Sequence, residues 1–143
     1  MRRYQRLIVA ARPAAYTRTV TNQRSPVVAI VDDDRSVLSA LKDLLESAGL
    51  SAQCFGSAEE FLEADHRHQT ACLVADIRMP GMSGLELQAE LKAGGSRIPI
   101  IFITAQTDGG MKLHALTAGA AACLSKPFDD DVLLEEVRAA LRG

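Results

Sequence analysis

From Pro26 onward, short strand-like runs rich in apolar residues alternate with longer stretches whose hydrophobic residues recur at helical spacing. Short apolar runs of this kind are typical of strands buried on both faces of a sheet. Five such runs occur, over residues 27–31, 51–55, 71–75, 98–103 and 121–124. Strands that alternate with helices predict a parallel sheet covered by helices on both faces, so we expect an α/β fold with five strands and five helices.

Helix-end signals support this division of the chain. Asp34 is placed to cap the first helix, and Gly49 is a natural stop. Ser57 with Glu60 three residues later forms the signature of a capping box for the second helix. The remaining helices are expected between residue 85 and the glycines at 94–95, over 109–118, and after the three aspartates at 129–131. Residues 65–70 are expected to form a polar loop.

Four of the strand-like runs end in chemically reactive side chains. Asp32 and Asp33 follow the first run, Asp76 follows the third, and Thr104 and Lys126 close the fourth and fifth. Right-handed crossovers bring the carboxyl ends of all parallel strands to one edge of the sheet. Ligands of open α/β sheets bind outside that edge, where the strand order reverses. The sequence therefore predicts that these side chains form one site.

The residue types at this edge suit phosphoryl chemistry. Three carboxylates repel one another unless a cation lies among them, and they are hard oxygen ligands suited to Mg²⁺ or Mn²⁺. An aspartate beside such a cation, facing the amine of Lys126 and the hydroxyl of Thr104, is equipped to accept a phosphoryl group. Each residue alone has a simpler explanation as a turn, a helix cap or a solvated loop residue. Their shared location favours the joint interpretation.

Composition divides the chain into two parts. Residues 1–25 carry six arginines and no acidic residue, whereas residues 26–143 hold 10 basic and 18 acidic side chains. We expect residues 1–25 to be a basic, disordered N-terminal extension, with an arm that binds nucleic acid or an acidic surface as the alternative. Residues 26–143 are expected to form one domain, since a hydrophobic fraction of 48% allows a packed core.

The sequence also favours the cytoplasm over a membrane or a secreted location. No apolar stretch approaches the roughly 18–20 residues that span a bilayer, and the apolar run near the N-terminus is too short for a signal peptide. The three cysteines, Cys54, Cys72 and Cys123, are odd in number and lie in or beside apolar runs. They are typical of small buried residues in a reducing compartment.

Four separated motifs together resemble one family, the receiver domain of bacterial two-component response regulators, over about residues 26–142. The motifs are Val31-Asp32-Asp33-Asp34, Asp76-Ile77-Arg78-Met79-Pro80-Gly81-Met82-Ser83-Gly84, Ile103-Thr104-Ala105 and Ser125-Lys126-Pro127-Phe128. The second motif is most similar to the FixJ-like group of receivers. The resemblance implies a CheY-like, doubly wound sheet with strand order 2-1-3-4-5.

The resemblance also implies a role for each site residue. Asp76 would be the phosphoacceptor, Lys126 would contact the phosphoryl group, and Thr104 would bond a phosphoryl oxygen and move inward. The implied ligands of Mg²⁺ are Asp33 directly, Asp32 mostly through water, Asp76, and the backbone carbonyl of Arg78. The protein would be a signalling switch that catalyses only its own phosphorylation and dephosphorylation and turns over no metabolite.

The implied partners are a sensor histidine kinase or a histidine phosphotransfer protein, and a downstream protein. The chain ends at Gly143, about where the fifth helix is expected to finish. We therefore expect a single-domain regulator without an output domain. DNA binding is not expected of the acidic folded part, and a phosphorylation-dependent homodimer is left open.

One departure from the family pattern concerns the output. The family usually has an aromatic residue three positions before the lysine, and this chain has Cys123 there. A thiol cannot fill the same volume, so we predict that the output relies on the loop over residues 105–110. Two alternatives are a receiver-like module that acts without phosphate and a phosphatase of the haloacid dehalogenase type, whose Asp-x-Asp spacing is matched only superficially by Asp32 and Asp34.

Overall fold

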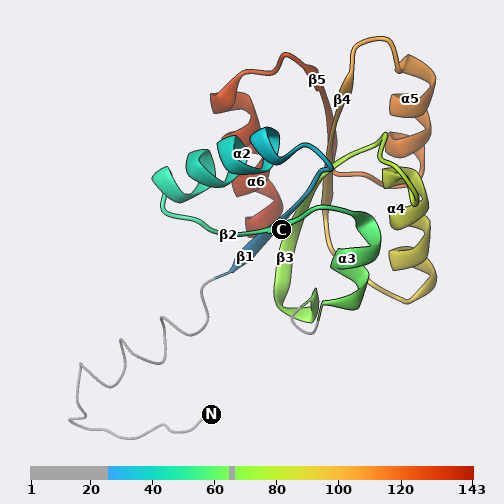
Figure 1. Cartoon of the computed structure of the whole chain (residues 1–143), viewed down its shortest axis with the longest axis horizontal. Helices are drawn as coiled ribbons and strands as arrows, with labels where there is room; N and C mark the ends of the chain where they lie inside the picture. Colours follow the sequence, from blue (N-terminus) through green and yellow to red (C-terminus); the bar gives the residue numbers. More distant parts are fainter. Residues whose placement is uncertain (1–25, 65–66) are drawn as a thin grey trace, which may run out of the picture.

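A computed structural model of the chain describes residues 26–64 and 67–143. Within these residues, five strands alternate with five α-helices (Figure 1). In chain order they are β1 (Val27–Val31), α2 (Arg35–Ser47), β2 (Ser51–Phe55), α3 (Ala58–Glu63), β3 (Thr70–Asp76), α4 (Gly84–Ala93), β4 (Ile100–Ala105), α5 (Gly109–Thr117), β5 (Ala122–Lys126) and α6 (Asp130–Arg142). The extension predicted over residues 1–25 lies outside the described residues.

The strands form one parallel sheet in the order β2-β1-β3-β4-β5, which confirms the predicted fold class. The chain moves outward from β1 to β2 and then returns past β1 to β3. The strand order therefore reverses between β1 and β3, and the carboxyl ends of these two strands flank the position where open α/β sheets bind ligands.

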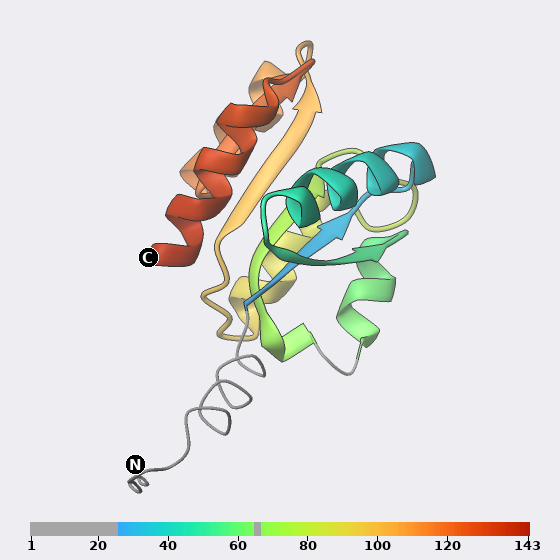
Figure 2. The ribbon, with the colours of Figure 1, turned by 90° about the vertical axis from the view of Figure 1, so that its left-hand side faces the viewer.

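The helices cover the two faces of the sheet unequally. Helices α2 and α6 lie on one face, and α3, α4 and α5 lie on the other (Figure 1). Figure 2 looks onto the face covered by α2 and α6. Right-handed crossovers place α2 opposite α3, α4 and α5, because the chain crosses the sheet in one direction through α2 and in the opposite direction through the other three. Helix α6 follows the last strand and packs beside α2. Alternate residues along the strands pack into two hydrophobic cores, one on each face of the sheet. For example, Val74 packs on the face covered by α2 and α6, and Leu73 packs on the opposite face.

Several helix starts follow the sequence signals closely. Asp34 caps α2 by accepting a 2.9 Å hydrogen bond from the backbone N–H of Ser36. Ser57 caps α3 by accepting from the backbone N–H of Glu60 at 3.0 Å. Asp129 does the same for α6 through the N–H of Asp131. These caps satisfy backbone donors that have no partner within the helix.

Some boundaries differ from the sequence-based expectation. Strand β3 begins at Thr70 and includes Asp76, and β5 extends to Lys126, so Asp76 and Lys126 are each the last residue of a strand. Strand β4 begins at Ile100, after Pro99, which has no N–H to give to a ladder. The expected loop at 65–70 contains a 3₁₀ turn, η1 (Arg67–Gln69). Short turns of this kind carry little periodic signal in a sequence.

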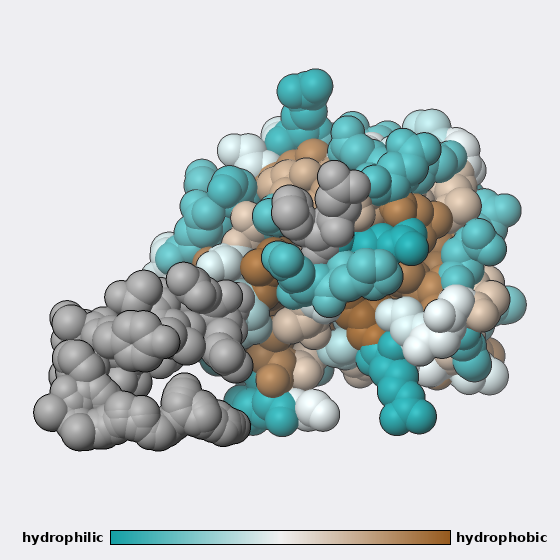
Figure 3. Space-filling view, turned by 90° about the horizontal axis from the view of Figure 1, so that it is seen from below, coloured by the Kyte–Doolittle hydropathy of each residue, from teal (hydrophilic) through white to brown (hydrophobic). Residues whose placement is uncertain are grey.

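Figure 3 shows the molecule from below, where hydrophobic residues are visible between hydrophilic ones. A hollow of about 450 Å³ lies among α3, η1 and the segment that follows α4, with Phe61, Leu91 and Ile98 in its wall. It shares no residue with the acidic side chains at the carboxyl edge of the sheet. Among residues 26–64 and 67–143, no helix is both long and apolar enough to cross a membrane.

Candidate functional site

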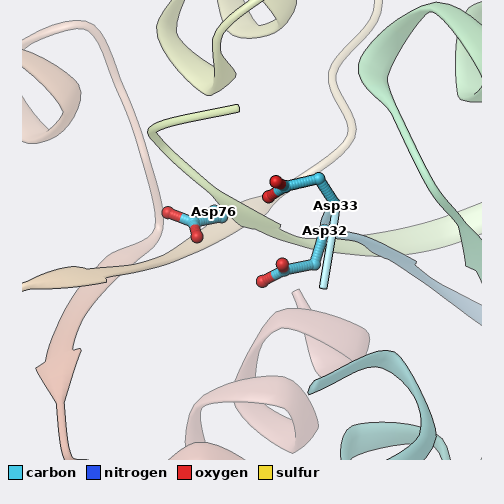
Figure 4. Close-up of side chains that lie close together, drawn as sticks. All are labelled: Asp32, Asp33 and Asp76. Carbon is cyan, nitrogen blue, oxygen red and sulfur yellow. The ribbon is translucent and has the colours of Figure 1, made fainter. Parts of the chain in front are cut away.

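Three aspartates converge at the point where the strand order reverses. Asp32 and Asp33 directly follow β1, and Asp76 ends β3 (Figure 4). One carboxylate oxygen from each residue lies within 4.8 Å of the others. Asp32 is 3% exposed, Asp76 is half-buried and Asp33 is exposed, so the cluster opens to solvent on one side. The structure therefore brings together the three carboxylates that the sequence predicted to meet.

Hydrogen bonds fix the orientation of the carboxylates of Asp32 and Asp76, the two less exposed members of the cluster. Asp32 Oδ1 accepts from the backbone N–H of Asp34 at 2.9 Å. Asp76 Oδ1 accepts from the backbone N–H of Arg78 at 3.2 Å, and Asp76 Oδ2 accepts from Lys126 Nζ at 3.2 Å. The Lys126–Pro127 peptide bond is cis. Lys126 thus lies directly against Asp76, as the sequence predicted, and supplies one positive charge to a site that holds three carboxylates.

Burial makes the charged form of Asp32 costly. It raises the pKa of the Asp32 carboxyl above its usual value, and the charges of Asp76 and Asp33 add to this effect. The hydrogen bond from Asp34 and the charge of Lys126 act in the opposite direction without cancelling the rise. A site that holds carboxylates together at this cost has the donors and the negative charge that a hard divalent cation requires.

Thr104 belongs to the same edge of the sheet, but its hydroxyl faces a different partner. Its side chain is 0% exposed and donates a 3.2 Å hydrogen bond to Asp108 Oδ2. Along β4 it follows Phe102 in alternation, on the face covered by α5, whereas Asp76 follows Val74 on the face covered by α2 and α6. The structure therefore places Thr104 at the edge without joining its hydroxyl to the carboxylate cluster.

Asp108 accepts the hydrogen bond from Thr104, although no motif in the sequence marks it as a site residue. Asp108 is 7% exposed and forms a bidentate ion pair with Arg78, with Nε to Oδ2 at 2.8 Å and Nη2 to Oδ1 at 2.9 Å. These hydrogen bonds and the guanidinium charge hold the pKa of the Asp108 carboxyl below its usual value. The side chain of Arg78 thus turns to Asp108. Asp108 directly precedes Gly109 and Gly110, and no signal in the sequence marked it as a functional residue.

Cys123 lies where α5 and β5 meet. It pairs with Phe102 in the sheet register and is half-buried against the core of the α5 face, which also contains Met111 and Ala120. Burial raises the pKa of the Cys123 thiol. Two residues further on, the hydroxyl of Ser125 accepts a 2.8 Å hydrogen bond from Lys112 Nζ on α5. A small thiol therefore occupies the position where the family usually has an aromatic ring.

The fold and the acidic site define a receiver-type signalling domain, and comparison with known proteins agrees. Residues 28–138 match the model of the response regulator receiver domain. Because the match covers most of the chain, the protein belongs to the response regulator receiver family. Receiver domains typically bind Mg²⁺ and interact with histidine kinases or phosphotransfer proteins, and they act as signalling modules and not as metabolic enzymes.

Curated relatives place the chain among two-component regulators. It is 47% identical over 121 residues to the response regulator protein TodT of Pseudomonas putida, covering 85% of this chain and 53% of TodT. It is 46% identical over 114 residues to nodulation protein W of Bradyrhizobium diazoefficiens, covering 80% and 50%. It is 44% identical over 114 residues to the transcriptional regulatory protein FixJ of Azorhizobium caulinodans, covering 80% and 54%. The chain spans about half the length of these relatives.

Solved structures show the same fold. The response regulator StyR superposes with a TM-score of 0.77 at 47% identity, covering 82% of this chain and 60% of that one. The crystal structure of FixJ-N superposes with a TM-score of 0.76 at 37% identity, covering 82% and 94%. These similarities confirm the predicted resemblance to FixJ-like receivers and the predicted strand order.

Proposed function

We propose that this protein is a phosphorylatable switch in which Asp76 accepts a phosphoryl group from a histidine kinase or a histidine phosphotransfer protein. The observation that carries the proposal is the position of the Asp76 carboxylate, which lies between Lys126 and the carboxylates of Asp32 and Asp33. An aspartate without a neighbouring lysine, and without carboxylates that can hold a cation beside it, would have no positive charge placed to compensate a transferred phosphoryl group. We assign residues 26–143 as the receiver domain and residues 1–25 as its extension.

The donor set fits Mg²⁺, with Mn²⁺ as an alternative. The three carboxylates have oxygens within 4.8 Å of one another, and carboxylate oxygens are hard ligands. The carboxylate of Asp32 is buried, and the neighbouring donor and positive charge balance only part of the cost of its negative charge. We assign Asp33 as a direct ligand, Asp32 as a ligand mostly through water, and Asp76 and the backbone carbonyl of Arg78 as the others. When bound, the cation neutralises charge on the phosphoryl oxygens and on the carboxylates around them.

The residues of the chain can carry out the transfer as follows. A carboxylate oxygen of Asp76 forms a bond to phosphorus while the bond between phosphorus and the imidazole nitrogen of the donor histidine breaks. The electron pair of the broken P–N bond returns to the imidazole ring. The backbone N–H of Arg78 and the amine of Lys126 hold the two oxygens of Asp76 in place beforehand. After transfer, Lys126 can pair with one of the new phosphoryl oxygens, and the hydroxyl of Thr104 can donate a hydrogen bond to another.

Intact-protein mass after incubation with Mg²⁺ and acetyl phosphate tests this proposal. We expect the wild-type chain to gain the mass of one phosphoryl group and Asp76→Asn to gain none, because an amide is not a nucleophile at phosphorus in this setting. Chelation of the metal should abolish the gain in the wild type. An equal gain in Asp76→Asn would contradict the assignment of Asp76, and no gain in a wild type that binds Mg²⁺ would favour the phosphate-independent module.

Asp32→Asn is expected to separate metal binding from stability. The variant should bind Mg²⁺ at least about tenfold more weakly, because a buried carboxylate near the cation is lost. Without metal it should be more stable than the wild type at neutral pH. The pKa of Asp32 is higher in the folded state than its unfolded value near 3.8, so the folded wild type loses stability as the pH rises through these two pKa values. Asparagine does not titrate, so the variant does not lose this stability.

Calorimetric Mg²⁺ titration and thermal unfolding with chelator measure these two effects. Asp43→Asn, on the exposed side of α2, is the matched control and should leave both unchanged. A thermal midpoint for metal-free Asp32→Asn that falls below the wild-type value would contradict the argument from burial.

The exposed surface supports a downstream protein partner. Leu113 and Leu116 are 68% and 45% exposed, and they belong to α5, the helix that directly follows Asp108. We assign protein contacts and not DNA contacts to residues 26–143, whose net charge is negative. We place the protein in the cytoplasm, where its three free thiols stay reduced.

Cys123 favours the second candidate function, an interaction module that acts without phosphate, because it removes the usual aromatic partner of Thr104.

A further inference from the structure

The contact between Thr104 and Asp108 has no place in the phosphorylation chemistry described above. Thr104 is the residue that must reach a phosphoryl oxygen on Asp76, yet its buried hydroxyl donates to Asp108 at 3.2 Å, on the α5 face of the sheet. The hydroxyl has one proton to donate, so it cannot serve Asp108 and a phosphoryl oxygen at the same time. The two interactions are therefore alternatives.

Arg78 makes the Asp108 side of this contact rigid. Its guanidinium binds both oxygens of Asp108, at 2.8 and 2.9 Å, in the bidentate geometry that fixes a carboxylate in one plane. Arg78 lies two residues after Asp76, and its backbone N–H also holds Asp76 Oδ1. One residue thus contacts the phosphoacceptor through its backbone and the partner of Thr104 through its side chain.

Asp108 stands at the start of α5 but does not cap it. It occupies the N-cap position, yet its side chain makes no capping hydrogen bond, unlike Asp34, Ser57, Ser83 and Asp129 at the other helices. Capping is the usual role of an aspartate at this position. Its carboxylate is instead committed to Arg78 and Thr104, which indicates that these contacts have a role other than starting the helix.

We propose that Asp108 is a positioning residue that holds Thr104 in its resting orientation, with Arg78 holding Asp108 in turn, so that phosphorylation of Asp76 must break the Thr104–Asp108 hydrogen bond. This inference rests on the proposed function. In this proposal, Asp108 couples Asp76 to α5. An aromatic residue at the position of Cys123 would otherwise provide this coupling. Because α5 begins at the next residue, a change in the contacts of Asp108 acts directly on the helix that exposes Leu113 and Leu116.

The test measures the affinity of the full chain for beryllofluoride, which mimics a phosphoryl group on an aspartate, by ¹⁹F NMR in the presence of Mg²⁺. The resting hydrogen bond opposes this binding, so Asp108→Ala should bind beryllofluoride about fivefold more tightly, as expected for loss of one competing hydrogen bond. Asp108→Asn keeps an acceptor but loses the charge and should show a smaller gain. Affinity for Mg²⁺ alone should stay unchanged in both variants.

A double-mutant cycle with Thr104→Ala separates positioning from a general structural effect. In the Thr104→Ala background, Asp108→Ala should no longer tighten beryllofluoride binding, because no hydroxyl remains to be released. An equal gain with and without Thr104, or no gain in either variant of Asp108, would overturn the inference. A wild-type chain that binds Mg²⁺ but neither beryllofluoride nor a phosphoryl group would instead overturn the proposed function, and the inference with it.

Discussion

Lys126→Gln is expected to slow phosphorylation of Asp76 by acetyl phosphate about 10²- to 10³-fold. The amine of Lys126 is the positive charge that the structure places on Asp76, at 3.2 Å from Oδ2. In the transition state, negative charge on the phosphoryl oxygens approaches a site that already holds three carboxylates. Removal of one preorganised donor at such a position typically has an effect of this size. Glutamine preserves most of the side-chain length, so the lost charge dominates the result.

The matched control is Lys112→Gln. Lys112 is also a lysine near the carboxyl edge of the sheet, but its amine donates to Ser125 and not to the carboxylate cluster. Its replacement should leave the phosphorylation rate within a factor of about two. Mg²⁺ affinity should be equal or greater in Lys126→Gln, because the cluster becomes more negative. The rates come from intact-protein mass against time, and equal rates for Lys126→Gln and the wild type would contradict the assigned role.

The acidic site could be predicted from the sequence because it follows from topology. Asp32, Asp76 and Lys126 lie up to 94 positions apart, but each comes at the end of a strand. Parallel strands with right-handed crossovers bring such ends to one edge whatever the length of the connections. No side-chain geometry is needed for this conclusion, which is why the converging carboxylates and their lysine were predictable residue by residue.

The partner of Thr104 could not be predicted in the same way. The pairing of Arg78 with Asp108 joins two loops 30 residues apart, and neither residue belongs to a periodic pattern. Their contact depends on loop backbone paths and on side-chain rotamers, and local sequence specifies neither of these. No sequence signal singled out Asp108, and Arg78 was significant only for its backbone carbonyl. The convergence of Asp32, Asp33, Asp76 and Lys126 was therefore predictable from the sequence, whereas the hydrogen bond between Thr104 and Asp108 was not.

Gly84→Ala is expected to destabilise the fold by about 2–3 kcal/mol, which corresponds to a fall in Tm of roughly 10 °C. Gly84 begins α4, and its N–H donates to the carbonyl of Ile77 at 2.7 Å, which brings the helix start against the end of β3. A Cβ atom here would overlap the carbonyl oxygen of Asp76. It would also lie 2.9 Å from Ile77 Cα and from Phe102 Cε1. Two of these three neighbours are backbone atoms, one in the last residue of β3 and one in the residue that follows it, and they cannot move without shifting the end of the strand.

The same substitution should also slow phosphorylation in the fraction that stays folded, because the backbone that must shift is that of Asp76, the proposed phosphoacceptor. Gly110→Ala is the matched control. Its Cβ would meet nothing within 4 Å, and alanine in a helix should raise stability by about 0.5 kcal/mol. Thermal unfolding of both variants and of the wild type measures the difference. A Gly84→Ala protein as stable as the wild type would show that β3 and α4 can separate without cost, and Asp76 would then be held by its hydrogen bonds alone.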